Sequence, residues 1–155
     1  AAVLAGAGSV VAVDLNPAAI ECARLNARRY GVLGQVLVRE GDMFEPVAGQ
    51  RFDLVLVNPP YFRGEARSDA QRAYMAGARF EWIRRLAQGL SEVLEPEGVA
   101  MMAIGDAAEV PAILEVLGDE GIAVVPAGDR EYLAETVHFF ELRTGRKVET
   151  ARHEA

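Results

Sequence analysis

The sequence predicts an α/β fold, a doubly wound sheet of mostly parallel strands whose last strand runs antiparallel. Along the chain, the apolar residues switch between short continuous runs, typical of buried strands, and a helical period of about 3.6. The last two expected strands, 122–125 and 136–142, are joined by a connection too short for a crossover helix. This final pair should therefore be antiparallel, whereas the earlier strands are connected through helices and should be parallel.

The first half of the chain contains three expected strands, at 10–13, 35–39 and 52–57. A helix is expected from Pro17 to about Tyr30, because Asn16 is a favourable N-cap and proline is favoured at the first helical position. Each strand is followed by polar residues or prolines, and two consecutive prolines after the third strand prevent it from continuing.

The second half contains two expected helices, at 83–94 and 106–117, and three expected strands, at 99–104, 122–125 and 136–142. The first helix should end at Pro96-Glu97-Gly98, and Pro111 is tolerable only near the start of the second helix. The closing segment is polar and should fray. We therefore assign one domain to residues 1–143 and a tail to residues 144–155.

The composition is that of an ordinary globular domain. The chain has 155 residues, of which 51% are hydrophobic and 25% charged, and this excludes collagen-like, disordered and disulfide-scaffold classes. Its only cysteine, Cys22, lies among apolar residues of the first helix and is expected in the core; a single cysteine fits a reducing, cytoplasmic location. No run of about 18 apolar residues could cross a bilayer. The net charge of −7 opposes binding to nucleic acid or acidic membranes except at a local basic patch.

Two aspartates follow the first two expected strands, where ligands of open α/β sheets bind. Asp14 ends the first strand, beside Leu15, and its two carboxylate oxygens can accept both hydroxyls of a ribose, although Asp14 is equally suited to capping the following turn. Asp42 follows Gly41 and can accept from the amino group of adenine, with Met43 beside the ring. Each aspartate is ambiguous when taken alone.

The sharpest signal is the tetrad Asn58-Pro59-Pro60-Tyr61 after the third strand. Two prolines make the backbone rigid, so the Asn58 side-chain oxygen and the Pro59 carbonyl can both accept hydrogen bonds from one NH₂ group. Such bonds orient a planar nitrogen and stabilise the positive charge that develops on it, while Tyr61 offers a flat surface for stacking. An ordinary turn after a strand would explain the two prolines, but not the asparagine before them together with the tyrosine after them.

From Val10 to Arg143 the chain resembles the S-adenosylmethionine-dependent amino methyltransferases, whose catalytic motif is Asn or Asp, Pro, Pro and an aromatic residue. The resemblance is carried by the sequence segments 12–17, 40–42 and 52–61. It implies S-adenosylmethionine as cofactor, bound by Asp14, Leu15, Asp42, Met43 and Asn58, and a catalytic role for Asn58, Pro59, Pro60 and Tyr61. It also implies a Rossmann-like methyltransferase sheet with strand order 3-2-1-4-5-7-6 and an antiparallel last strand.

The start of the chain departs from this family. The family's first strand and the glycine-rich loop after it, which holds the methionine part of the cofactor, are expected to be missing here, so the chain should be an N-terminally truncated domain. Gly6-Ala7-Gly8 does not replace that loop, because it precedes a strand and lacks the third glycine of G-x-G-x-x-G. We interpret it as a helix end followed by a turn.

The resemblance leaves two classes of methyl acceptor: the side-chain amide of a protein glutamine, and the exocyclic amine of adenine in RNA or DNA. Residues 62–85 carry six arginines against three acids, so this segment is +3 and could follow phosphates. The overall acidity argues against nucleic acid. The stretch 73–79 resembles the segment after the tetrad in glutamine methyltransferases that act on translation release factors. We favour glutamine slightly.

Two hypotheses from other classes remain. Asp14 after an apolar strand also suits the ribose of NAD in an oxidoreductase, but hydride transfer has no use for the tetrad. A non-catalytic scaffold that has lost its cofactor loop is the second hypothesis. No metal is expected, because His138 and His153 have no companion ligands. The pattern does not indicate an oligomeric state.

Overall fold

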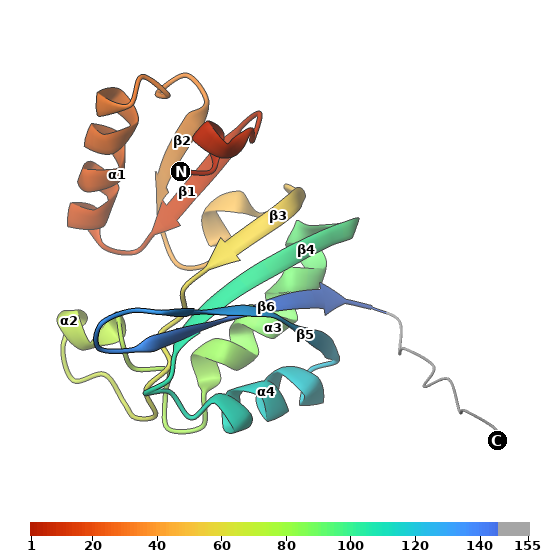
Figure 1. Cartoon of the computed structure of the whole chain (residues 1–155). Coiled ribbons are helices and arrows are strands. Elements are labelled where there is room, and N and C mark those ends of the chain that lie inside the picture. Colours follow the sequence, from red (N-terminus) through yellow and green to blue (C-terminus); the bar gives the residue numbers. More distant parts are fainter. Residues whose placement is uncertain (146–155) are drawn as a thin grey trace. The chain divides into compact units, whose positions relative to one another are not determined.

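The computed structural model describes residues 1–145, shown in Figure 1. Its contacts divide the chain into two compact units, Ala1–Gly49 and Gln50–Ala155. The predicted tail at 144–155 lies outside the described residues from position 146 onward, while Thr144 is the last residue of a strand. No helix within residues 1–145 is long and apolar enough to cross a membrane.

The first unit is a βαβ arrangement, with a 3₁₀ turn before it and another after it (Figure 1). Its elements are η1 (Val3–Ala5), β1 (Val10–Asp14), α1 (Pro17–Arg29), β2 (Val36–Glu40) and η2 (Glu45–Val47). β1 and β2 pair in parallel, from Val10 opposite Val36 to Asp14 opposite Glu40. Both strands therefore end at the same edge of the two-stranded sheet.

The ends of α1 follow the sequence signals that predicted them. The side chain of Asn16 accepts a hydrogen bond from the Ala18 N–H at 2.9 Å, and Pro17 occupies the first helical position. At the other end the helix stops before Gly31, whose φ of 68° favours glycine. Cys22 was expected in the core but is exposed on α1, because Ile20 and Ala27 form the buried side of this helix.

The segment Gly6-Ala7-Gly8 is a helix end, as predicted. Gly6 caps the 3₁₀ helix η1 in the left-handed conformation, with φ of 107°, and its N–H donates to the Val3 carbonyl at 3.0 Å. This is the geometry of a C-terminal cap. It leads into β1 and is not a turn between a strand and a helix, which is where a phosphate-binding loop lies.

The second unit is a four-stranded mixed sheet with helices. Its elements are β3 (Phe52–Val57), α2 (Asp69–Arg72), α3 (Glu81–Val93), β4 (Leu94–Gly105), α4 (Val110–Asp119), β5 (Ile122–Glu131) and β6 (Thr136–Thr144). The strand order is β3-β4-β6-β5, with β3 and β4 parallel and β6 antiparallel to both of its neighbours. This order confirms the predicted antiparallel last strand and matches the 4-5-7-6 part of the expected topology.

The core of this unit lies between the sheet and the helices α3 and α4. Apolar residues of α3 repeat at helical spacing and are almost fully buried, as are alternate residues of β4 and β6. The buried set comprises Ile83, Leu86, Leu90, Ala100, Met102, Ile104, Ile113, Leu117, Phe140 and Leu142. The carboxyl ends of β3 and β4 are therefore supported by a closely packed apolar core.

Two predicted boundaries in this unit were wrong. The strand expected to begin at Val99 begins at Leu94, directly after α3 ends at Val93, so residues 94–98 already belong to β4. The helix expected from Asp106 begins at Val110, because the Asp106 carboxylate accepts the Thr136 N–H at 3.1 Å and so joins the end of β4 to β6. A short helix, α2, also lies between β3 and α3, where no helix was assigned from the sequence.

Replacing Gly41 with alanine should destabilise the first unit. Gly41 has φ of 153°, and a Cβ placed there would lie 2.3 Å from Cγ of Pro46, which is rigid and cannot turn away. Backbone strain and overpacking should together reduce the free energy of unfolding by about 1–3 kcal/mol, measured by urea denaturation. Gly34→Ala is the matched control, because nothing lies within 4 Å of its Cβ position. Equal stability of the two variants would contradict this account of the turn.

Candidate functional site

In the first unit, Asp14 and Asp42 lie at the same edge of the β1–β2 sheet. Asp14 is paired with Glu40, and the Gly41 N–H donates to the Asp14 carbonyl at 3.0 Å. Asp42 is the next residue along the chain. The structure therefore brings together, at the carboxyl ends of two parallel strands, the two aspartates that the sequence placed 28 residues apart.

Asp14 caps the turn before α1 and still presents an acceptor oxygen. Its Oδ1 accepts a hydrogen bond from the Asn16 N–H at 2.8 Å, so Asp14 does cap the following turn, as the alternative interpretation predicted. Within residues 1–145, Oδ2 takes no hydrogen bond, and the side chain is exposed beside Leu15, which is 48% exposed. One carboxylate thus holds the turn and can also accept a hydroxyl hydrogen of a ribose, which fits the cofactor expected here.

Met43 has a main-chain conformation that the sequence did not predict. Its φ is 50°, in the left-handed region that residues other than glycine rarely adopt. The conformation belongs to a tight turn in which the Glu45 N–H donates to the Asp42 carbonyl at 3.0 Å. A strained main chain of this kind persists only where neighbouring contacts keep it in place. Asp42 and Met43, which are both partly buried, are therefore held in defined positions at the carboxyl edge of the sheet.

In the second unit, the tetrad follows β3 with its polar groups available. Pro59 and Pro60 are buried, whereas Asn58 is exposed and Tyr61 is partly buried. Within the described residues, no other group hydrogen-bonds to the Asn58 side chain or to the Pro59 carbonyl. Two acceptors on a rigid main chain are therefore free to hold the hydrogens of one NH₂ group.

The Tyr61 side chain lies close to Gly105, at the end of β4. A Cβ at Gly105 would lie 3.2 Å from the Tyr61 hydroxyl oxygen and 3.2 Å from Oε2 of Glu135. On its other side, the Tyr61 ring centroid is 4.9 Å from that of Phe62. Our sequence analysis singled out neither Gly105 nor Glu135, because only the pairing of distant segments brings them to Tyr61.

The basic segment at 62–85 is partly neutralised by the protein itself. Arg63 pairs with Glu109 at 2.9 Å, Arg72 with Asp69 at 3.6 Å, and Arg84 with Glu120. Glu109 and Glu120 lie outside the segment, so they offset part of its +3 charge. Hydrogen bonds from Gln88 and Arg84 also hold the pKa of Glu120 below its usual range, which keeps that carboxylate ionised.

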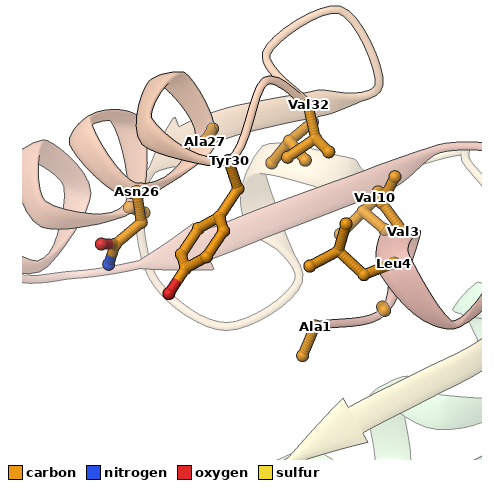
Figure 2. Close-up of a pocket in the computed structure, with 11 residues that line it drawn as sticks. Ala1, Val3, Leu4, Val10, Asn26, Ala27, Tyr30 and Val32 are labelled. Carbon is orange, nitrogen blue, oxygen red and sulfur yellow. The ribbon is translucent and has the colours of Figure 1, made fainter.

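A hollow in the first unit, drawn in Figure 2, is distinct from the aspartate edge. It is lined mainly by small and apolar residues of η1, α1 and the starts of β1 and β2, together with the side chains of Asn26 and Tyr30. Val10 and Val36 lie at the amino ends of their strands, whereas Asp14 and Glu40 lie at the carboxyl ends. The hollow is therefore at the end of the strands opposite to the candidate ribose-binding carboxylate.

Comparison with known families decides the class of this domain. A family model described as "Methyltransferase small domain" matches residues 1–117. The chain belongs to this family. Methyltransferase small domain proteins use S-adenosylmethionine, and the predicted family resemblance, fold class and cofactor are confirmed at this level.

Curated relatives of this methyltransferase domain include enzymes with different acceptors. The chain is 36% identical to a release factor glutamine methyltransferase of Geobacter sulfurreducens, over 62% of this chain and 37% of the relative. It is 30% identical to a tRNA1(Val) (adenine(37)-N6)-methyltransferase of Porphyromonas gingivalis, over 57% of this chain and 37% of the relative. The chain thus spans little more than a third of the length of these relatives.

A solved structure shows the same fold. It is a putative methyltransferase complexed with SAH, and it matches 90% of this chain and 40% of its own length with a TM-score of 0.67. At 13% identity the likeness supports the fold alone.

Proposed function

We propose that the protein transfers a methyl group from S-adenosylmethionine to a planar nitrogen, the side-chain amide of a glutamine in a protein of the release-factor type. The observation that carries this proposal is the tetrad at the end of β3, where Asn58 and the Pro59 carbonyl are two acceptors with no partner in the described chain. They would hold both hydrogens of the acceptor NH₂ group and orient its nitrogen.

Asp14, Leu15, Asp42 and Met43 are proposed to bind the ribose and adenine of the cofactor, and Asn58 is proposed to contact it as well. When bound, S-adenosylmethionine supplies an electrophilic methyl group on a sulfonium ion. Asn58 and Pro59 would bind and orient the acceptor nitrogen and stabilise its developing positive charge, while Tyr61 would stack on the acceptor. This chemistry requires no nucleophilic side chain of the protein.

Two observations favour glutamine over adenine. The identity is higher to the release factor glutamine methyltransferase than to the tRNA adenine methyltransferase, 36% against 30%. In addition, Arg63 and Arg84 of the basic segment 62–85 are paired with acids of the same chain and are less available to phosphates. Adenine in RNA remains the second candidate, because one relative is named for that activity.

The acceptor class can be tested by supplying tritiated-methyl S-adenosylmethionine to the whole protein with release factor, tRNA, ribosomal RNA and DNA in parallel. We expect incorporation into the release factor and little into the nucleic acids. Incorporation into tRNA alone would establish the second candidate. Tight binding of NADH without binding of S-adenosylmethionine would instead favour an oxidoreductase and contradict the proposal.

Replacing Tyr61 with alanine should impair acceptor binding more than turnover, because the flat ring is lost. The expected result is a rise of roughly 10-fold in the KM for the acceptor, or a loss of about 1–3 kcal/mol if the acceptor is a base. Tyr61→Phe keeps the ring and should change KM less than about threefold. Steady-state kinetics at saturating cofactor measure both variants. An equal defect in Tyr61→Phe and Tyr61→Ala would assign the role to the hydroxyl group and contradict stacking.

A further inference from the structure

Arg63, two residues after the tetrad, joins three segments that are distant in the sequence. Its Nε and Nη2 donate to Oε1 and Oε2 of Glu109, each at 2.9 Å, and Glu109 is the N-cap residue of α4. Its Cζ also lies 4.5 Å from the centroid of the Phe80 ring, and Phe80 immediately precedes α3. The Arg63 guanidinium therefore connects the loop that follows the tetrad to the starts of α3 and α4.

The main chain around Arg63 is fixed to the segment that precedes α3. The Phe62 N–H donates to the Tyr74 carbonyl, and the Phe62 carbonyl accepts the Ala76 N–H, both at 2.8 Å. Gly64 and Gly77 exchange two hydrogen bonds of 3.1 Å. In the described part of the chain, Phe62 is the first residue after β3 with a main-chain hydrogen bond. The tetrad is thus held by β3 at one end and by residues 62–64 at the other.

Phe80, on which Arg63 stacks, is itself constrained. Its ring is buried, with 2% of the residue exposed, and its φ of 58° is unusual for a residue other than glycine. A bulky residue keeps this conformation only when its surroundings hold it. The Arg63 guanidinium therefore packs on a rigid surface, and not on a mobile side chain.

We propose that Arg63 is a positioning residue for the acceptor site, which holds residues 62–64 against Glu109 and Phe80 and thereby sets the geometry of Asn58 to Tyr61. This inference rests on the proposed function. A partly exposed ion pair contributes little to global stability, but a bidentate Arg–carboxylate pair with stacking defines orientation closely. Because a displacement of about 1 Å in a reacting group can cost about 100-fold in rate, the effect should fall on turnover.

The charge state of the pair supports this role. The hydrogen bond from Arg63 holds the pKa of the Glu109 carboxyl below its usual range, and the same bond raises the pKa of the Arg63 guanidinium. Both groups therefore remain charged at neutral pH.

The test combines turnover with a measurement that does not depend on the reaction. In the whole protein, Arg63→Ala and Glu109→Ala should each lower kcat by about 10- to 100-fold, with cofactor affinity unchanged.

The double variant should be no worse than the worse single variant, because the two residues act as one unit. Arg63→Lys should not restore turnover, since an ammonium cannot form the bidentate pair. Arg72→Ala is the matched control, because among residues 1–145 its only ion-pair partner is the exposed Asp69, at 3.6 Å.

Hydrogen exchange supplies the independent measurement. Arg63→Ala should speed exchange of the Phe62 and Gly64 amides roughly 10-fold or more while leaving the core strands unchanged. If the wild-type protein methylates no acceptor but exchange rises as expected, the proposed function fails and the anchoring role stands. Additive effects in the double variant, or unchanged exchange with unchanged kcat in Arg63→Ala, would overturn the inference. Loss of cofactor affinity and of core protection together with kcat would also overturn it, because that result indicates general unfolding.

Discussion

Replacing Asn58 with alanine should lower kcat by about 100-fold or more while leaving the affinity for S-adenosylmethionine nearly unchanged. The reason is that the Asn58 oxygen is proposed to accept a hydrogen bond that strengthens as positive charge develops on the acceptor nitrogen, so its loss affects the transition state more than the bound ground state. Single-turnover kinetics with labelled cofactor give the rate, and calorimetry gives the affinity.

Asn58→Asp is the matched control for this variant. It keeps an acceptor oxygen at the same position, and the family motif accepts either residue, so it should retain much more activity than Asn58→Ala. Full turnover in Asn58→Ala on the best acceptor would show that the tetrad is structural, and the mechanism proposed for it would then be wrong.

Replacing Asp14 with alanine should weaken cofactor binding by about 1.5–3 kcal/mol, the range for hydrogen bonds to a charged group. Asp14 is exposed at the end of β1, and its Oδ2 is available to a ligand hydroxyl. Calorimetric titration of the whole protein with S-adenosylmethionine or its demethylated product measures the change.

The structure supplies the control for this variant, because Asp14 also caps the turn through the Asn16 N–H. Asn16→Ala disturbs the same turn, since it removes the cap on Ala18, but it leaves the Asp14 carboxylate in place. We expect Asn16→Ala to lower stability with only a small effect on affinity. Equal loss of affinity in both variants would mean that Asp14 acts through the turn and does not contact the ribose.

The sequence predicted strands where a continuous apolar run ends at a polar residue or proline. β1 and β3 begin and end within one residue of the predictions, because Asp14 and Asn58-Pro59 mark their ends clearly. β4 began earlier than predicted because Phe52 pairs with Leu94 and Leu54 with Val99, so the residues around Pro96 form a bulge within the strand. A proline tolerated in a bulge cannot be distinguished from a helix stop by pattern alone.

The second half of β5 lacks the apolar pattern on which the prediction depended. Residues 125–131 are exposed and include three charged residues, and only their pairing with β6 makes them a strand. Sequence periodicity detects a strand through its buried face, so this extension had no signal. The same limit applies to α2, whose four residues are all at least partly exposed.

Within the candidate site, the sequence predicted residues that follow strands but not those that support them. Asp14, Asp42 and the tetrad were found because the carboxyl ends of parallel strands are the usual ligand edge. Arg63 and Glu109 are 46 residues apart, and the approach of Tyr61 to Gly105 depends on the β3–β4 register. Such contacts follow from tertiary packing and have no local signature.

The most direct test of the central claim is mass spectrometry of release factor incubated with the whole protein and S-adenosylmethionine. The account predicts one added methyl group, located by fragmentation on the side-chain nitrogen of a glutamine, and its loss when Asn58→Ala replaces the wild-type protein. A methyl group found only on adenine of tRNA supplied in the same reaction, or one that Asn58→Ala adds as fast as the wild type, would contradict it.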